Sequence, residues 1–197
     1  MQVRKRLLFG SLAVSAVASV AVGFMLADRD AGSSNSTVAD GTEVSDTRPA
    51  PDIGGIDTNA VVEGKQLPDV TLQNLAGDDI ATSSLIGTPM VINVWGSTCI
   101  PCREELPAFA SAHAKYGNTV RFVGLDFLGA STHEEEFARS KGVDYELLYD
   151  GNGEFISAAG IAAFPVTLFV NAQGVIVRQT GQLDEATLAK YIESDLG

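Results

Sequence analysis

Short apolar runs separated by polar turns characterise the chain from about residue 63 to its C-terminus. Residues 90–95 (MVINVW) and 120–125 (VRFVGL) are mostly apolar, which is typical of strands buried on both faces of a sheet. Two further apolar runs, residues 166–170 and 175–180, flank the turn sequence Asn171-Ala172-Gln173-Gly174. This arrangement predicts a hairpin.

The segment after the first strand is predicted to be a helix over residues 100–116. Pro101 lies in its first turn and is tolerated there, because an N–H group at that position would make no hydrogen bond within the helix. Pro107 lies further in and is expected to kink the helix. Ser131 and Glu134 have the spacing of a capping box, which predicts the start of a second helix over residues 131–141.

Two more helices complete the pattern. Residues 152–159 favour a short helix, and residues 183–196 favour a longer one with Asp184 as its N-cap. In the longer helix one face carries Leu188, Tyr191, Ile192 and Leu196. Alternating strands and helices followed by a hairpin and a helix predict an α/β domain over residues 63–197, with a central mixed sheet flanked by helices.

The N-terminal pattern is different. Arg4, Lys5 and Arg6 precede residues 7–26, which carry no charge and would span about 30 Å as a helix, the thickness of a bilayer core. The basic cluster predicts that residues 1–6 stay in the cytoplasm and that the rest of the chain is exported. A cleaved signal sequence is the alternative interpretation of residues 7–26, and it also places the domain outside the cytoplasm.

Residues 27–62 are rich in Asp, Ser, Thr, Gly, Ala and Pro and contain no aromatic residue. Such a composition does not bury enough apolar surface to offset the entropy lost on ordering. We therefore expect a flexible, disordered linker between the membrane anchor and the domain.

The charge balance argues against one class of partner. The chain has 13 Lys and Arg residues against 25 Asp and Glu residues, for a net charge of −12. An acidic surface repels phosphate backbones, so we expect no nucleic-acid partner. His113 and His133 are the only histidines and neither has metal-ligand spacing to the cysteines, so we expect neither a metal nor a cofactor.

The candidate chemistry lies in the chain's only two cysteines, Cys99 and Cys102. A strand predicted to end at Trp95 and a helix beginning near Cys99 would place that thiol at a helix N-terminus, where free N–H groups favour a thiolate. Cys99 would attack a partner disulfide, and Cys102, one turn on and facing the interior, would resolve the mixed disulfide. The alternative is a static disulfide, which would close a very small loop and constrain the unfolded chain little.

Residues 93–107 (NVWGSTCIPCREELP) resemble the active-site segment of extracytoplasmic thioredoxin-like proteins of the ResA/TlpA family, and the resemblance continues through residues 164–174 (FPVTLFVNAQG). It implies a thioredoxin-like fold and a thiol–disulfide oxidoreductase. It further implies reduction of exported protein disulfides, such as those of apocytochrome c, with electrons from a membrane-embedded donor of the CcdA kind.

The resemblance also implies roles for single residues. Glu105 matches an acidic residue of the family and would exchange a proton with the buried Cys102 thiol. Asn93 stands where cytoplasmic thioredoxins have a buried aspartate, which leaves proton handling more dependent on Glu105.

Other positions would form the surface that meets the partner. Pro165 aligns with the family's cis-proline facing the disulfide, and Phe164 would line the substrate groove. Trp95 is expected to cover the motif as part of this surface, with a place in the core as the alternative. Thr98 departs from the family, which usually has tryptophan there, so the shape of the partner-facing surface is expected to differ.

Three other functions compete with a reductase. An oxidant of the DsbA kind would use the same cysteines, although the chain has no room for the large helical insertion of such proteins. A thiol peroxidase would usually have threonine three residues before its reactive cysteine, where this chain has Gly96. A non-catalytic redox or metal-binding module would bind copper or zinc through Cys99 and Cys102.

Overall fold

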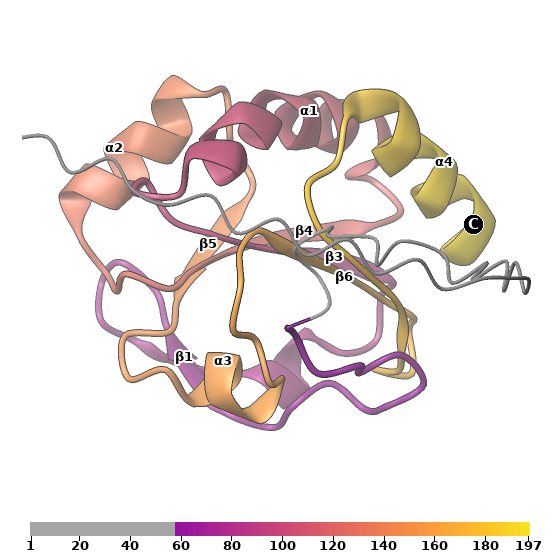
Figure 1. Cartoon of the computed structure of the whole chain (residues 1–197), viewed down its shortest axis with the longest axis horizontal. Coiled ribbons are helices and arrows are strands. Elements are labelled where there is room, and N and C mark those ends of the chain that lie inside the picture. Colours follow the sequence, from indigo (N-terminus) through magenta and orange to yellow (C-terminus); the bar gives the residue numbers. More distant parts are fainter. Residues whose placement is uncertain (1–57) are drawn as a thin grey trace, which may run out of the picture. The chain divides into compact units, whose positions relative to one another are not determined.

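One mixed sheet forms the centre of the computed structural model, which describes residues 58–197 (Figure 1). Its seven strands lie in the order β2-β1-β5-β4-β3-β6-β7. Strand β3 is parallel to β4, β4 is parallel to β5, and all other neighbours are antiparallel. The strands are β1 Thr71–Gln73, β2 Asp79–Ala81, β3 Met90–Trp95, β4 Arg121–Asp126, β5 Glu146–Tyr149, β6 Val166–Val170 and β7 Ile176–Thr180.

Helices cover both faces of the sheet. Three helices lie on one face and the short α3 lies on the other (Figure 1). The helices are α1 Ile100–Tyr116, α2 Thr132–Ser140, α3 Glu154–Ala158 and α4 Glu185–Asp195, and a 3-10 turn, η1, spans Thr82–Leu85.

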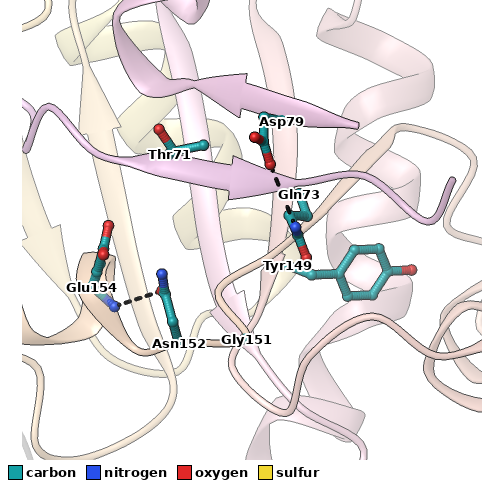
Figure 2. Close-up of a pocket in the computed structure, with 7 residues that line it drawn as sticks. All are labelled: Thr71, Gln73, Asp79, Tyr149, Gly151, Asn152 and Glu154. Carbon is teal, nitrogen blue, oxygen red and sulfur yellow. Dashed lines mark hydrogen bonds between the residues drawn. The ribbon is translucent and has the colours of Figure 1, made fainter. Parts of the chain in front are cut away.

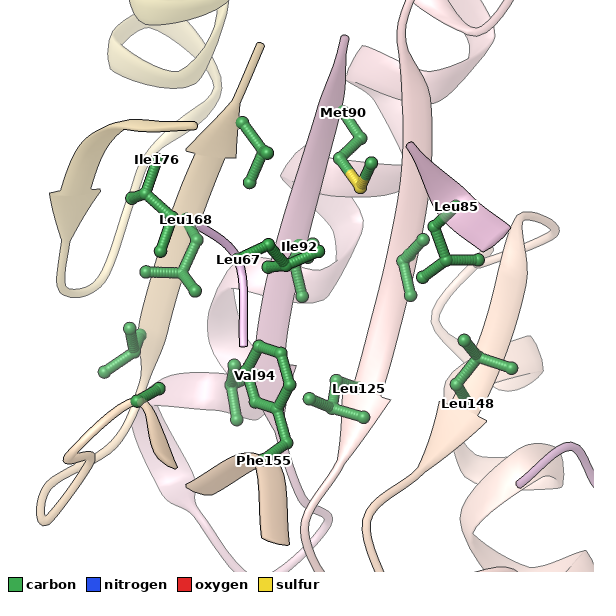
Figure 3. Close-up of a cluster of buried hydrophobic side chains, with 14 of the residues drawn as sticks. Leu67, Leu85, Met90, Ile92, Val94, Leu125, Leu148, Phe155, Leu168 and Ile176 are labelled. Atoms are coloured by element: carbon green, nitrogen blue, oxygen red, sulfur yellow. The ribbon is translucent and has the colours of Figure 1, made fainter. Parts of the chain in front are cut away.

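The two faces of β3 show why these residues form a central strand. All six of its side chains are buried, and because successive side chains point to opposite faces they divide between two cores. Ile92 and Val94 join Leu125, Leu168 and Phe155 in the core on the α3 side, where Figure 3 shows Phe155 beside Val94. Val91, Asn93 and Trp95 face the core under α1, α2 and α4.

The predicted elements are confirmed to within a few residues. Strand β3 and helix α1 have the predicted bounds, and α1 continues through Pro107. Ser131 and Asp184 cap α2 and α4 by accepting hydrogen bonds from Glu134 N and Thr187 N. The mixed sheet between helices is also as predicted.

Three strands were not predicted. Strands β1 and β2 have three residues each, too few for a period of two to stand out. Strand β5 has four residues and begins with the charged Glu146, whose carboxylate pairs with Arg121 of β4 at 2.6 Å. These strands exist because the edge of the sheet supplies hydrogen-bond partners, which no local pattern reveals.

The folded part starts earlier than residue 63, where the sequence analysis placed its boundary. Val62 is buried in the α3-side core, and Asn59 makes three hydrogen bonds more than 100 residues away. Its Oδ1 accepts from Ala162 N and Ala163 N, and its Nδ2 donates to Ala163 O. Single polar contacts of this kind leave no trace in composition, so residues 59–62 were wrongly assigned to the linker.

The predicted anchor over residues 7–26 and most of the predicted linker lie outside the described residues. Within residues 58–197, none of the helices is long and apolar enough to cross a membrane.

We predict that Asn59→Ala lowers the free energy of unfolding by about 1–3 kcal/mol, because two backbone N–H groups and one carbonyl lose their partner. Urea denaturation of the whole chain would measure the loss. Asn118→Ala, at an exposed asparagine in the turn after α1, is the control and should change stability little. Equal midpoints for the two variants would contradict the structural role of Asn59.

Candidate active site

Cys99 is the N-cap of α1, and the sulfur atoms of Cys99 and Cys102 are joined in a disulfide. The amide of Cys102 points at Cys99 Sγ from 3.3 Å, and Cys99 O accepts from Arg103 N. Cys99 is partly exposed, whereas Cys102 is fully buried. The exposed sulfur therefore lies where the first N–H groups of the helix stabilise negative charge, which is the arrangement that an attacking thiolate requires.

The loop between β3 and α1 fixes the position of Cys99. Its first turn is closed by a hydrogen bond of 3.0 Å from Cys99 N to Gly96 O. The next residue, Ser97, donates from its backbone N and its Oγ to the two carboxylate oxygens of Glu134 on α2, at 2.9 and 2.5 Å. A capping box would instead direct Glu134 to the N-terminus of its own helix. The capping spacing thus predicted the helix start, while the carboxylate serves the active-site loop.

Glu105 is buried one turn after Cys102 on α1, with 2% of its surface exposed. Asn93 Nδ2 on β3 donates to its Oε1 at 2.7 Å, and Leu183 N, just before α4, donates to its Oε2 at 3.0 Å. Burial raises the pKa of Glu105 from 4.5 to about 7, although these two donors favour the ionised form and oppose the rise. Glu105 can therefore gain or lose a proton near neutral pH beside the buried thiol.

Pro165 lies just before the start of β6, the strand that pairs with β3. The Phe164–Pro165 peptide bond is cis, as the resemblance implied. Pro165 directly precedes β6, whose first residue, Val166, pairs with Val94 of β3, so Pro165 lies at the strand end from which the active-site loop departs. The ring of Phe164 is partly buried and stacks on Phe127 with centroids 4.0 Å apart.

Apolar side chains are exposed on the surface near Cys99. Ile100, between the two cysteines, is 67% exposed, and Leu128, in the loop after β4, is 45% exposed. Thr98 is exposed as well, so no large ring covers the disulfide at the position where the family usually has tryptophan. The surface next to Cys99 is thus open and partly apolar, which suits an unfolded or extended partner segment.

Trp95 was wrongly assigned to this surface. It is completely buried, because it ends the central strand β3 and its side chain points under the helices, where it stacks on Phe137 of α2. Trp95 supports the loop from below and does not contact a partner.

Residues 58–197 hold no group of three or more His, Cys, Asp or Glu side chains arranged to bind a metal ion. They do contain a polar cavity of about 560 Å³, lined by residues of β1, β2 and the segment after β5 (Figure 2). Within it Gln73 bonds to Asp79, and Glu154 N bonds to Asn152 Oδ1. None of its lining residues belongs to the thiol site, so the cavity has no part in the exchange chemistry.

Comparison with known proteins agrees with this geometry. A model of the AhpC/TSA family matches residues 63–179, more than half of the chain. The chain belongs to the AhpC/TSA family. Its folded part is a thioredoxin-like α/β domain.

Individual relatives indicate the type of activity within this family. The thiol-disulfide oxidoreductase ResA of Bacillus subtilis is 26% identical over 135 residues, which cover 68% of this chain and 75% of the relative. DsbF of Mycobacterium tuberculosis, solved in mixed oxidised and reduced forms, has a TM-score of 0.58 at 25% identity and covers 64% of this chain and 94% of its own. A thioredoxin domain from a Bacteroides vulgatus thiol-disulfide oxidoreductase has a TM-score of 0.63 at 16% identity over 70% of this chain and 100% of its own, and supports the fold alone.

This AhpC/TSA-family protein is a thiol–disulfide oxidoreductase of the ResA/DsbE type. In the reductive direction expected for this pair, a Cys99 thiolate would attack one sulfur of a partner disulfide and release the other as a thiolate, which would take up a proton. The Cys102 thiol would then lose its proton and attack Cys99 Sγ, which would free the partner as a dithiol and leave the disulfide seen here. Two electrons pass from the cysteine pair to the partner, and the oxidative direction is the reverse of these steps.

Two contacts of this site had no signal in the sequence. The bond of Glu134 to Ser97 spans 37 residues, and that of Leu183 N to Glu105 spans 78. Both depend on how α2 and the segment before α4 pack on the sheet, and a backbone N–H donor has no residue type to recognise.

The raised pKa of Glu105 gives a pH dependence with a definite sign. A carboxyl group with a higher pKa in the folded than in the unfolded state stabilises the fold at low pH, and that stabilisation is lost as the pH rises from 4.5 to about 7. Glu105→Gln cannot ionise. The stability of the variant relative to the wild type should therefore increase by roughly 3 kcal/mol over this range.

Denaturation of the oxidised proteins at several pH values would measure this difference. Glu104→Gln, at the exposed neighbour on α1, is the matched control, and its difference in stability from the wild type should not change with pH. A flat difference for Glu105→Gln as well would mean that Glu105 titrates as an ordinary surface carboxyl group.

Proposed function

We propose that this enzyme works outside the cytoplasm, held to the membrane by its N-terminal segment, and reduces disulfides in exported proteins such as apocytochrome c. In this proposal a membrane-embedded donor of the CcdA kind re-reduces the Cys99–Cys102 disulfide. The observation that carries the proposal is the asymmetric thiol pair, with Cys99 accessible at the start of α1 and Cys102 buried one turn before the buried Glu105.

The asymmetry supports a catalytic pair over a structural disulfide. A partner can reach Cys99 beside the exposed Ile100 and Leu128. Cys102 is shielded from solvent thiols, while Glu105 can accept its proton during resolution of the mixed disulfide. A disulfide with a purely structural role needs neither the open approach nor the buried carboxyl group.

The membrane location rests on the sequence. Arg4, Lys5 and Arg6 followed by the charge-free residues 7–26 favour an anchor with the domain on the outer side. Outside the cytoplasm no thioredoxin or glutathione pool keeps thiols reduced. A reductase in that compartment therefore needs electrons delivered through the membrane, which supports a membrane-embedded donor.

The competing functions predict different measurements. An oxidant of the DsbA kind would have a less negative reduction potential and would accept electrons from its partners. A thiol peroxidase would consume peroxide, although Gly96 leaves the reactive cysteine without the usual threonine hydroxyl. A metal-binding module would bind copper or zinc through the reduced pair and reduce insulin poorly.

We predict that a membrane-impermeant thiol reagent labels Cys99 in intact cells after mild reduction, because the domain is exported. Mass spectrometry of the purified chain would locate the label. A cytoplasmic protein with an exposed cysteine is the control and should be labelled only after lysis. Labelling of Cys99 only after lysis would refute the proposed location.

We predict that Cys102→Ala accumulates mixed disulfides with its partners. The wild-type mixed disulfide collapses quickly because Cys102 attacks from one helical turn away at a very high effective concentration. In the variant only external thiols release the partner. Non-reducing gels of membrane fractions should therefore show adducts that dithiothreitol removes.

Cys99→Ala is the matched control and should trap fewer adducts, because Cys102 is fully buried. Adducts with exported proteins that contain paired cysteines, together with a membrane-embedded donor, would support the reductive direction. Adducts with a quinone-linked oxidase would show instead that the pair works as an oxidant.

A further inference from the structure

Two buried carboxyl groups beside the active-site loop have no part in the exchange chemistry described above. Asp126 is the last residue of β4 and is completely buried, and Glu134 on α2 is 5% exposed. Asp126 lies opposite Trp95 in the ladder between β4 and β3, so it flanks the point where the loop to Cys99 begins. Buried carboxyl groups are costly unless they are paired or protonated, and their presence here needs a physical reason.

Each group holds a different loop. Glu134 accepts both hydrogen bonds from Ser97, two residues before Cys99. Asp126 Oδ1 accepts from Leu128 N at 2.6 Å and so fixes the loop after β4. In that loop the ring of Phe127 stacks on Phe164. The same ring lies so close to Gly96 that a Cβ atom added there would be 2.8 Å from it. The two carboxyl groups thus fix both loops that border the thiol pair.

The second oxygen of Asp126, Oδ2, receives no hydrogen bond from any N–H or O–H group among residues 58–197. The charged group that acts on Asp126 is the neighbouring carboxyl group of Glu134, which raises the pKa of Asp126. Two neighbouring buried carboxylates repel each other, and a buried oxygen without a donor is costly. A proton held between Asp126 and Glu134 would give Oδ2 a bond and remove one of the two charges.

Three other titratable groups lie near the pair, and within residues 58–197 none of them donates to Asp126 Oδ2. Tyr149 of β5 lies opposite Asp126 in the sheet, and burial raises its own pKa to about 12, so it stays neutral. His133 Nε2 is 4.0 Å from Glu134 on the exposed side. Arg139 forms its salt bridge with Glu135, at 3.1 Å. Burial and the charge of Glu134 raise the pKa of Asp126 from 3.8 to about 8, while Leu128 N opposes the rise.

We propose that Asp126 and Glu134 are positioning residues for Cys99, which hold the two bordering loops together through a shared proton and loosen them when that proton is lost. Below about pH 8 the pair carries a single negative charge and Ser97 is held. Above it two buried like charges repel, and the tie between the loops weakens. Cys99 then spends less time at the start of α1, and its thiolate is stabilised less. The proposal concerns the thiol exchange itself and does not depend on the partner or the compartment.

The rate of Cys99 alkylation by iodoacetamide in the reduced enzyme, measured from about pH 5 to 10, tests the proposal. Wild type should show the titration of the thiol and a second inflection near pH 8 from the carboxyl pair. Asp126→Asn keeps an acceptor for Leu128 N but cannot release a proton, so the second inflection should disappear. A profile of Asp126→Asn that superimposes on that of wild type would overturn the shared-proton role.

The positioning role has a separate test. Glu134→Ala removes both bonds to Ser97 and should slow alkylation at neutral pH about threefold to tenfold, with a raised thiol pKa. Glu134→Gln retains an oxygen acceptor and should recover most of the rate, with the second inflection moved to lower pH because the charge of Glu134 no longer raises the pKa of Asp126. Glu136→Ala, at an exposed glutamate on the same helix, is the control.

Circular dichroism before each measurement confirms that the variants are folded. If Glu134→Ala is unfolded, the comparison between Glu134→Gln and Asp126→Asn still decides, since both keep the shape of the side chain. Asp126→Asn should lose the inflection near pH 8, and Glu134→Gln should move it to lower pH; an inflection at the wild-type pH in Glu134→Gln would overturn the coupling of the two groups. Folded Glu134→Ala with the rate and thiol pKa of the Glu136→Ala control would overturn the positioning role.

Discussion

The junction between β3 and α1 is the constraint on which the rest of the site depends. Strand β3 is buried on both faces and paired on both edges, so its last residue, Trp95, has a fixed position. A short turn closed by Cys99 N and Gly96 O then starts the helix. The position of Cys99 follows from this turn, and the helical repeat places Cys102 and Glu105 beneath it, facing Asn93 on the same strand. Exchange chemistry thus depends on a packed strand more than on any flexible element.

The core under α1, α2 and α4 is mostly apolar but contains several buried polar side chains. Asn93, Glu105, Asp126 and Glu134 are all buried there, whereas on the α3 side the buried carboxyl group of Asp150 accepts from the backbone at the start of α3. The pKa values of Glu105 and Asp126 are both raised, because burial outweighs the hydrogen bonds that each carboxyl group accepts. Ionisation of these two buried groups therefore destabilises the fold increasingly as the pH rises. This destabilisation arises at the site where protons are transferred.

The sequence predicts the elements of the fold that have a long and regular pattern of apolar residues. Strand β3 and helix α1 extend over enough residues for their apolar patterns to be distinctive, and the spacing of the cysteines indicated the chemistry. Contacts between distant segments were not predictable. The capping spacing marks Glu134 as a residue of the first helical turn, but nothing in the local sequence predicts that it is buried and reaches Ser97 while Glu136, two residues later, is exposed. Trp95 was misplaced for a related reason, because the direction of a side chain at a strand end depends on the face that the helices cover.

Asn59 gives the domain a mechanical property. It lies at the start of the described chain, and its three hydrogen bonds end on Ala162 and Ala163, just before the Phe164–Pro165 bond. A force applied to the chain upstream of residue 58 would therefore act first on the segment that leads into the cis Phe164–Pro165 bond, and only then on the core. Tension on the N-terminal segment is thus transmitted to this segment through the side chain of Asn59 and the backbone bond from Ala60 N to Gly160 O.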